Sequence, residues 1–264
     1  IRDRSVSRGL GDVYKRQDSG FDKRRTVEAG YKQQHIGLSR RTWLCSDVLY
    51  TGSADSVIAG TCRVKNMSNI REIVEEEWSQ FQKVNNEGGR ASCQDDWKTF
   101  YIMRKSQFLV WPEEVLDSYY GDLCKAREEG KNLLFYKYAF MMERTAPEQY
   151  KQLEWALPVI SEERKQRIEA TVAVHVKWAE EFEQEYPAYA MRGRPIHAFQ
   201  EAPGQTSIET YQRGELYSYG EHTEMLYSQY IQECAAQNRN LAALIRENSA
   251  RMYGYESIAD LERE

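Results

Sequence analysis

The sequence predicts an all-α fold, a helical bundle built from two tandem repeats of roughly five helices each. From about residue 67 onward, apolar side chains recur at steps of three and four, which is the period of an amphipathic helix. Glycine or proline bounds many of these segments, as at Pro112, Gly130 and Pro187. A helix, a loop and four further helices occur twice in the same order, which predicts an internal duplication.

The first repeat covers residues 67–157 and opens with a helix over about 69–84. Ser92 and Asp95 have the spacing of a capping box, which we expect to open the second helix. The fourth helix is apolar nearly all round and is therefore predicted to be central. The remaining helices are expected over about 95–110 and 112–130, in the segment after Gly130, and over 147–155.

The second repeat covers residues 158–264 and contains a long loop over 188–205. Trp78 aligns with Trp178 at an offset of 100, and we expect both indoles to be buried at equivalent places. After the loop the offset becomes 108, as for the asparagines at 132 and 240. The helices are expected over about 162–185, 206–219, 221–237 and 240–252, with a last one from Tyr255.

Charge divides the chain into two unequal parts. Residues 1–66 hold 13 Lys and Arg against 7 Asp and Glu, whereas residues 67–264 hold 23 against 34, a net charge of −11. The acidic part also carries 15 of the 18 tyrosines and five of the six tryptophans, so it alone has the apolar mass for a core. Its negative charge argues against nucleic acid as a partner, since non-specific binding to nucleic acid needs a basic surface.

The basic part is predicted to be a non-native or disordered leader. Residues 1–17 resemble a translated sequencing-adapter remnant of the kind found at the ends of metagenomic reading frames. Residues 18–66 show no helical or strand period and are interpreted as upstream read-through. Met67 directly precedes Ser68, a good N-cap for the first periodic helix, and we therefore hypothesise that translation starts at Met67.

Several classes of site and compartment are disfavoured. No run reaches the roughly 18 apolar residues of a membrane span, and no secretory h-region opens the chain. Five irregularly spaced cysteines fit a reducing cytoplasm better than a disulfide framework. No nucleotide-binding or hydrolase motif occurs and no histidine follows Glu at the di-iron spacing, so no cofactor and no metal are predicted. A carboxylate-only Mg²⁺ site at Glu87, Asp95 and Asp96 stays open as a weak alternative.

Three motifs carry a resemblance to a known family. They are Val84–Trp97 with the Phe100–Phe108 segment that follows it, Gly193–His197, and Tyr253–Ser257. Over roughly Met67 to Glu264 the chain resembles the bacterial family known as domain of unknown function 4125, and residues 1–66 lie outside that resemblance. The resemblance implies a shared fold and supplies no catalytic residue.

The candidate ligand site lies in the two loops that follow the first helix of each repeat, and in the helix behind the first loop. Arginines there offer bidentate contacts to a carboxylate or phosphate, and carboxylates and histidine can transfer protons. If the repeats pack about a pseudo-twofold axis, the loops face one cleft and two of the arginines, one from each loop, approach the same ligand. The candidate residues are Arg90, Asp95, Asp96, Arg104, Arg192, Arg194 and His197.

Structural roles compete with each of these assignments. Asp95 and Asp96 are ordinary acids for a helix N-terminus, and each arginine could clamp two helices together. Cys93 lies near a helix start, but the two neighbouring aspartates oppose an activated thiolate there. His175 falls on an inward stripe and is expected to be a satisfied core histidine.

Two functional interpretations follow. The first is a binder of a small polar or anionic metabolite, or an enzyme acting on one, in the cleft between the repeats. The second is a non-catalytic helical adaptor that docks a protein partner on an exposed aromatic face. The first predicts converging arginines around a concave site, and the second predicts a flat apolar patch with arginines paired to acids.

Overall fold

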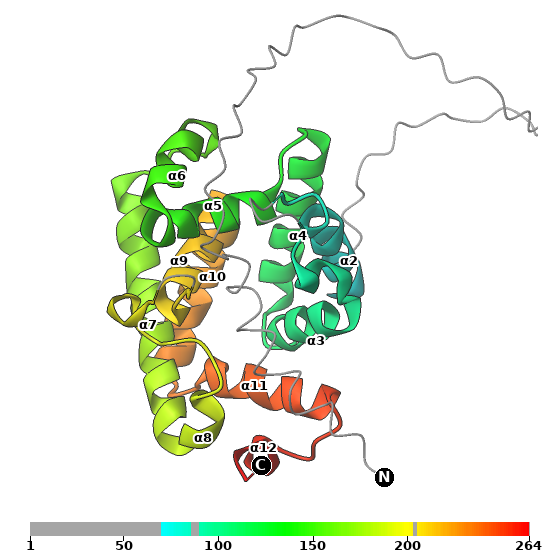
Figure 1. Ribbon diagram of the computed structural model, residues 1–264, viewed down its shortest axis with the longest axis vertical. Coiled ribbons are helices and arrows are strands. Elements are labelled where there is room, and N and C mark those ends of the chain that lie inside the picture. The colour runs from blue at the N-terminus through cyan, green and yellow to red at the C-terminus, as the bar shows by residue number, and fades with distance from the viewer. Residues whose placement is uncertain (1–69, 86–89, 203–204, 264) are drawn as a thin grey trace, which may run out of the picture. The chain divides into compact units, whose positions relative to one another are not determined.

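The computed structural model describes residues 70–85, 90–202 and 205–263 (Figure 1). Within these ranges the chain forms eleven α-helices, three short 3-10 helices and no strand, so the all-α prediction is confirmed. No helix in this described part is both long and apolar enough to cross a membrane. The predictions made for residues 1–66 lie outside the described residues.

The first half of the described chain contains five α-helices and one 3-10 turn. They are α2 (Ile70–Phe81), η1 (Ser92–Asp95), α3 (Trp97–Phe108), α4 (Glu113–Glu128), α5 (Leu133–Thr145) and α6 (Pro147–Leu153). The expected capping box at the start of the second helix is wrong in detail. Ser92 and Asp95 belong to η1, and Asp96 is the N-cap of α3, where its carboxylate accepts from the Thr99 N–H at 3.0 Å.

The second half has the long helix and the series of shorter helices that the sequence predicts. Its elements are η2 (Glu154–Ala156), α7 (Glu162–Glu185), α8 (Pro187–Ala190), η3 (Ala198–Gln200), α9 (Ile208–Ser218), α10 (Glu221–Ala236), α11 (Leu241–Met252) and α12 (Ile258–Glu262). Two of them, α8 and η3, lie inside the segment expected to be a plain loop. Pro187 explains α8, because proline fits the first turn of a helix.

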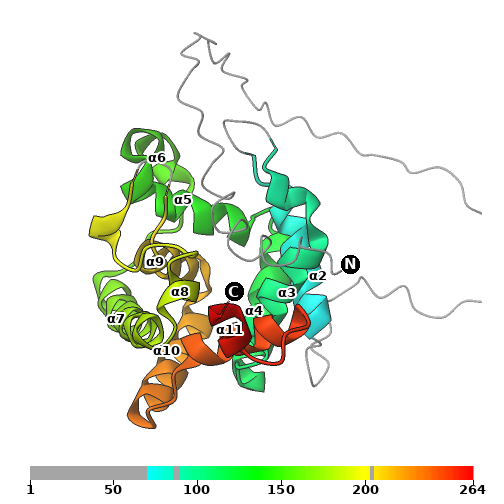
Figure 2. The same cartoon turned by 60° about the horizontal axis from the view of Figure 1, so that its bottom comes forward.

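The helices pair in a pattern that recurs in the two halves. α2 packs against α3, α4 and α5, and α7 packs against α9, α10 and α11 (Figures 1 and 2). Between the halves, α5 packs on α9, α11 packs on α3, and α4 packs on α10. Exchanging the halves therefore leaves these nine pairs unchanged, although α8, which packs on α7 and α12, has no counterpart in the first half.

Equivalent side-chain contacts mark corresponding positions in the two halves. The Tyr119 hydroxyl donates to Glu77 Oε1 at 2.6 Å, and the Tyr227 hydroxyl lies 3.0 Å from His175 Nε2. Glu77 and His175 are 98 residues apart in the sequence, and Tyr119 and Tyr227 are 108 residues apart. An offset of 98 between α2 and α7 pairs residue 80 with Trp178. The two-repeat layout stays a prediction, and the register proposed for its first helices is shifted by two residues.

Helix caps give a second set of correspondences. Asp96 caps α3, and Ser207 caps α9 by accepting from the Thr210 N–H at 3.0 Å. Counted from these caps, Arg104 and Glu215 occupy the same position in their helices. Two residues beyond the ends of α4 and α10 the backbone has a positive φ, +69° at Gly130 and +55° at Asn238.

Aromatic side chains fill the centre, where α4 meets α10. The Trp111 ring lies 4.9 Å from the Tyr227 ring and 5.8 Å from the Tyr119 ring, centroid to centroid. Of the two tryptophans expected to be buried, Trp178 is 3 % exposed, whereas Trp78 is only half-buried. Trp78 instead packs in an outer aromatic group at the start of α3. The expectation of two equivalent buried indoles is therefore wrong.

The two tryptophans should differ in their contribution to stability. We expect Trp178→Ala to lower the free energy of unfolding by about 3–5 kcal/mol, because it removes a buried indole and leaves a cavity. Trp78→Ala should have a smaller effect, since part of its ring already faces water. Urea unfolding of both variants measures the difference, and equal losses would contradict the burial pattern described here.

Candidate functional site

Four buried charges meet where α2, α3, α5 and α9 come together. Arg104 of α3 donates to both carboxylate oxygens of Glu77, from Nε at 2.7 Å and from Nη2 at 2.6 Å. Its third nitrogen, Nη1, lies 2.9 Å from Glu215 Oε1. Lys137 of α5 completes the set by donating from Nζ to Glu215 Oε2 at 3.0 Å. We call Glu77, Arg104, Lys137 and Glu215 the ion network, and all four are buried.

Neutral donors complete the coordination of the two carboxylates. Tyr119 donates to Glu77, as described above, and the Tyr219 hydroxyl donates to Glu215 Oε1 at 3.0 Å. Burial raises the pKa of Glu215, but Arg104 and Lys137 outweigh it and hold that pKa well below its usual range. Glu215 therefore stays charged, and the carboxylate oxygens of the network are occupied by protein donors.

The first predicted loop is held by its own residues. Arg90 Nε lies 2.8 Å from Asp95 Oδ1, and Arg90 Nη2 donates to the Gln94 carbonyl at 2.8 Å and also to the Gln82 side chain. These bonds tie η1 to the end of α2, which is the clamp that the structural interpretation describes. Because Arg90 and Asp95 are both well exposed, this ion pair contributes little to stability.

Cys93 and Asp96 complete the account of this loop. Burial, with smaller contributions from Asp95 and Asp96, raises the pKa of the Cys93 thiol above its usual value. Cys93 is therefore a neutral thiol in this setting, as the neighbouring aspartates predict. Asp96 serves as the N-cap of α3, so its carboxylate is also engaged by backbone.

The second predicted loop distributes its residues among different contacts. Arg194 donates from Nη1 to the Thr206 carbonyl at 3.0 Å, and its guanidinium lies over the Tyr211 ring, 5.0 Å from the centroid. His197 Nε2 lies 3.1 Å from Glu180 Oε1 of α7. Arg192 is half-buried and joins neither contact. The candidate residues thus separate into a clamp at Arg90, the buried network at Arg104, and two places in the second loop.

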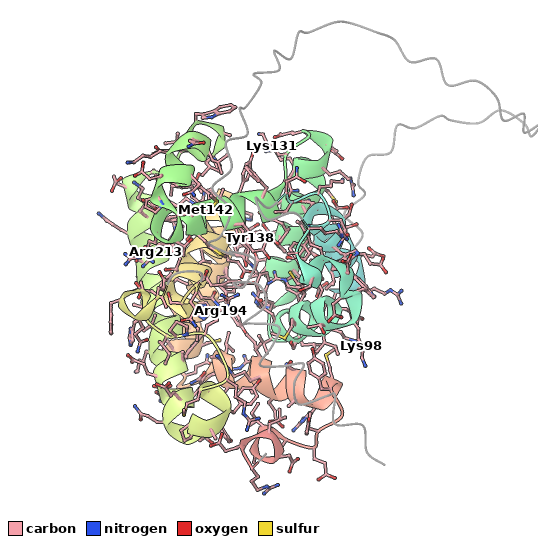
Figure 3. The ribbon with its side chains drawn as sticks, viewed as in Figure 1. Lys98, Lys131, Tyr138, Met142, Arg194 and Arg213 are labelled. Atoms are coloured by element: carbon pink, nitrogen blue, oxygen red, sulfur yellow. The ribbon has the colours of Figure 1, made fainter. Side chains whose placement is uncertain are left out.

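Tyr138 of α5 packs against the end of α2, with its ring centroid 5.9 Å from that of Phe81. Burial and then the nearby phenol of Tyr211 raise the pKa of Tyr138 well above its usual range, and Cys93 and Arg194 also act on it electrostatically. Cys93 belongs to the first loop and Arg194 to the second. Figure 3 shows Tyr138 and Arg194 toward the centre of the view. The pKa of Tyr138 therefore depends on charges in both loops, while its ring contact is with α2.

Sequence reasoning missed five residues of this region. Two of them left a signal. Glu77 interrupts the apolar stripe of α2 between Val74 and Phe81, and Lys137 is the one charged residue between Leu133 and Met142 of α5. A charged residue on a buried face is a mark of a paired internal ion. The residues missed are Glu77, Lys137, Tyr138, Tyr211 and Glu215.

A second polar cluster joins α7 to α10 and has a structural role. Glu224 is fully buried, and Arg167 contacts both of its carboxylate oxygens, the closer at 2.7 Å. Arg164 donates to the Tyr219 carbonyl at 2.7 Å and to the Leu216 carbonyl at 3.3 Å. It thereby satisfies carbonyl groups that the end of α9 leaves without helical partners.

His175 is a satisfied core histidine, as the sequence predicts. Its ring is buried, stacks on Tyr227 with centroids 6.0 Å apart, and meets Trp178 edge-on at 5.4 Å. Burial lowers its pKa to about 4. In the part of the chain that the structure describes, no three side chains of His, Cys, Asp or Glu gather as they would around a metal ion.

Loss of Arg104 should destabilise the protein strongly. Arg104→Met leaves Glu77 and Glu215 buried with too little positive charge, so we expect a loss of about 3–5 kcal/mol in the free energy of unfolding. Arg251→Met is a suitable control, because Arg251 is an exposed side chain paired with Glu247 on the same helix, and it should change stability by less than about 1 kcal/mol. Similar losses in the two variants, measured in urea, would argue against the ion network as a major constraint.

His175 should make stability depend on pH below neutrality. The folded state keeps His175 neutral, whereas the unfolded chain takes up a proton below its ordinary pKa near 6.5. Stability is therefore lost as the pH falls from about 6.5 toward 4, by about 2 kcal/mol between pH 7 and 5. In urea unfolding at both values, His175→Gln should show a smaller loss than the wild type. An unchanged pH dependence would assign the effect to other groups.

Comparison with known proteins identifies one family that the chain matches. A family model described as "Protein of unknown function (DUF4125)" matches residues 67–263. No curated protein and no solved structure matches the chain. The match includes every described helix and agrees with the resemblance inferred from the sequence motifs. The chain belongs to the DUF4125 family.

Proposed function

We propose that this protein binds a small polar ligand beside Tyr211, where Arg194 of the second loop and Lys137 of α5 both approach the ring. The observation that carries the proposal is that Arg194 of the second loop lies over the Tyr211 ring, 5.0 Å from its centroid, while Lys137 of α5 donates to the Tyr211 oxygen at 2.6 Å. Loops on a rigid helical frame are a common place for ligand binding. The half-buried state of Arg194 and Tyr211 suits such a site, because these groups are partly shielded from water and still accessible.

The chemistry of the surrounding groups favours binding over catalysis. Cys93 is held as a thiol, His175 is buried against Tyr227, and the oxygens of Glu215 are taken by protein donors. A general base must reach the proton that it removes, and these groups are engaged elsewhere. What the region offers to a ligand is hydrogen-bond donors, positive charge and aromatic surface.

Exposed apolar side chains support the adaptor as a second candidate. Trp155 is 84 % exposed and Val159 is 97 % exposed, and both lie in the short connection between α6 and α7. Exposed apolar side chains that form a large contiguous patch mark protein-interaction sites, whereas single ones are common on protein surfaces. Arg90 and Arg104 are also paired with acids, which the adaptor interpretation expected. The polar ligand remains our first proposal, because these two side chains alone do not form a large apolar patch.

A thermal-shift screen of the full-length chain tests the proposal. The screen should contain small anionic, cationic and neutral polar metabolites at concentrations that saturate a weak site. A ligand present at a hundred times its Kd adds about 2.7 kcal/mol, which raises the melting temperature by roughly 5 to 10 °C for a domain of this size. We expect Arg194→Gln to abolish or strongly reduce the shift caused by the ligand.

The control is Arg251→Gln, which removes a positive charge from an exposed position on α11. Each variant is compared with its own melting temperature without ligand, so a change in basal stability does not enter. A ligand shift that Arg251→Gln and Arg194→Gln reduce equally would show a general charge effect. No shift with any compound, or shifts that ignore Arg194, would reject a site at this place.

A further inference from the structure

A surface hollow lies where the end of α7 meets α11 and α12 (Figure 1). Its volume is about 370 Å³, which is within the range of pockets that bind small molecules. Phe182 of α7, Ala243 and Leu244 of α11, and Ile258 of α12 give it an apolar lining. Leu244 is 38 % exposed, so part of this lining faces water. None of the residues that line the hollow belongs to the site proposed beside Tyr211.

The hollow depends on a small side chain at Ala243. Asn240 caps α11 by accepting from the Ala243 N–H at 3.0 Å, and its amide donates to a carbonyl group of α7 at 3.0 Å. In the first half, Asn132 caps α5 by accepting from the Phe135 N–H at 2.9 Å, and its amide donates to a carbonyl group of α2 at 2.8 Å. These matching contacts place Phe135 in the first half where Ala243 stands in the second. Phe135 packs partly buried against the core, whereas the methyl group of Ala243 leaves open the space that such a ring would fill.

Two polar side chains of the hollow are already engaged by the protein. Glu247 accepts from Arg251 Nε at 3.0 Å on one oxygen and from the Ile258 N–H at 2.9 Å on the other. Asn240 uses both ends of its amide in the contacts that cap α11. These groups stabilise the walls of the hollow, and the capacity to bind a charged ligand lies with the other polar residues.

The two remaining charges, Glu185 and Arg239, have opposite signs. Both side chains are exposed and both line the hollow. Within the described part of the chain, they form no ion pair with each other or with another charged group. Each has a neutral tyrosine hydroxyl beside it, Tyr186 beside Glu185 and Tyr230 beside Arg239, and a neutral group does not cancel a charge. The hollow therefore combines an apolar surface with one negative and one positive group.

We infer that this hollow binds a small zwitterion with an apolar side chain, its ammonium group toward Glu185 and its carboxylate toward Arg239. Ion pairs with a carboxylate and a guanidinium are charge-assisted hydrogen bonds, and the apolar side chain covers Leu244. A ligand with a single charge would use one of the two groups and remove water from the other without replacing it. Free amino acids and short peptides share this chemistry and differ in the distance between their charges. The site is distinct from the one proposed beside Tyr211.

The test measures binding of simple probes to the full-length chain by calorimetry at constant ionic strength. L-leucine and L-leucyl-L-leucine represent the two kinds of zwitterion. Leucinamide lacks the carboxylate of leucine, and 4-methylpentanoate lacks its ammonium group. Each analogue loses one charged contact, so its Kd should be roughly tenfold to a hundredfold higher than that of the zwitterion. The tighter of the two zwitterions indicates whether the charges of the ligand are close together or far apart.

Three variants change the hollow itself. Ala243→Phe introduces the side chain that the first half carries, and by filling the hollow it should abolish binding of both zwitterions. Glu185→Gln and Arg239→Gln each remove one charge from an exposed position, and each should raise the Kd roughly tenfold to a hundredfold. Ala173→Phe and Glu183→Gln are the matched controls, because both residues are exposed on α7 outside the hollow. Neither control should change the Kd.

Three results would overturn the inference. They are no binding of either zwitterion, equal Kd values for leucine and a single-charge analogue, and binding that is unaffected by Ala243→Phe or by either charge variant. Arg194→Gln should leave leucine binding unchanged, which separates this site from the one beside Tyr211. Leucine binding that Arg194→Gln abolishes and Ala243→Phe does not would assign the ligand to the Tyr211 site and reject the hollow. Circular dichroism of each variant verifies that the helical fold is retained.

Discussion

The rest of the structure depends on the buried contact between Arg104 and its two carboxylates. Removing these charges from water is costly, and only close pairing inside the protein offsets that cost. Glu77, Glu215 and Lys137 come from three other helices, so the cost is offset only when α2, α3, α5 and α9 all hold their places. Apolar packing alone would tolerate small shifts between these helices. The ion network makes the positions of four helices depend on one another.

The helices themselves were predictable because their signals are local. Apolar period, proline at helix starts and glycine at helix ends depend on neighbours in the sequence, and α4 and α7 begin and end close to where these signals place them. The capping of α3 was harder, because Ser92, Asp95 and Asp96 lie within five residues and only three-dimensional geometry selects Asp96. The alignment of α2 with α7 was shifted by two residues, because it matched Trp78 to Trp178 on residue identity alone.

The candidate site was less predictable, for a different physical reason. Arginine beside glycine is a local pattern, and the sequence cannot show which acid a long side chain will reach. Arg90 meets Asp95 five residues away, whereas Arg104 meets Glu215 across more than a hundred residues. The tyrosines near Arg194 carried no signal of their own, because tyrosine at helical spacing is typical of a core. Only the placement of α5 against α9 turns Lys137 and Tyr211 into a pair.

The equivalent positions of Arg104 and Glu215 also decide whether the halves can replace one another. Counted from the helix caps, these two side chains occupy matching places in α3 and α9, and they meet each other. Two copies of the second half would oppose two buried carboxylates with no guanidinium between them. Two copies of the first half would keep the Arg104–Glu77 pair but lack the second carboxylate that Glu215 supplies to Arg104. Each half therefore supplies a charge that the other half lacks. Covalent linkage in one chain guarantees that the two unlike surfaces are always present in equal number.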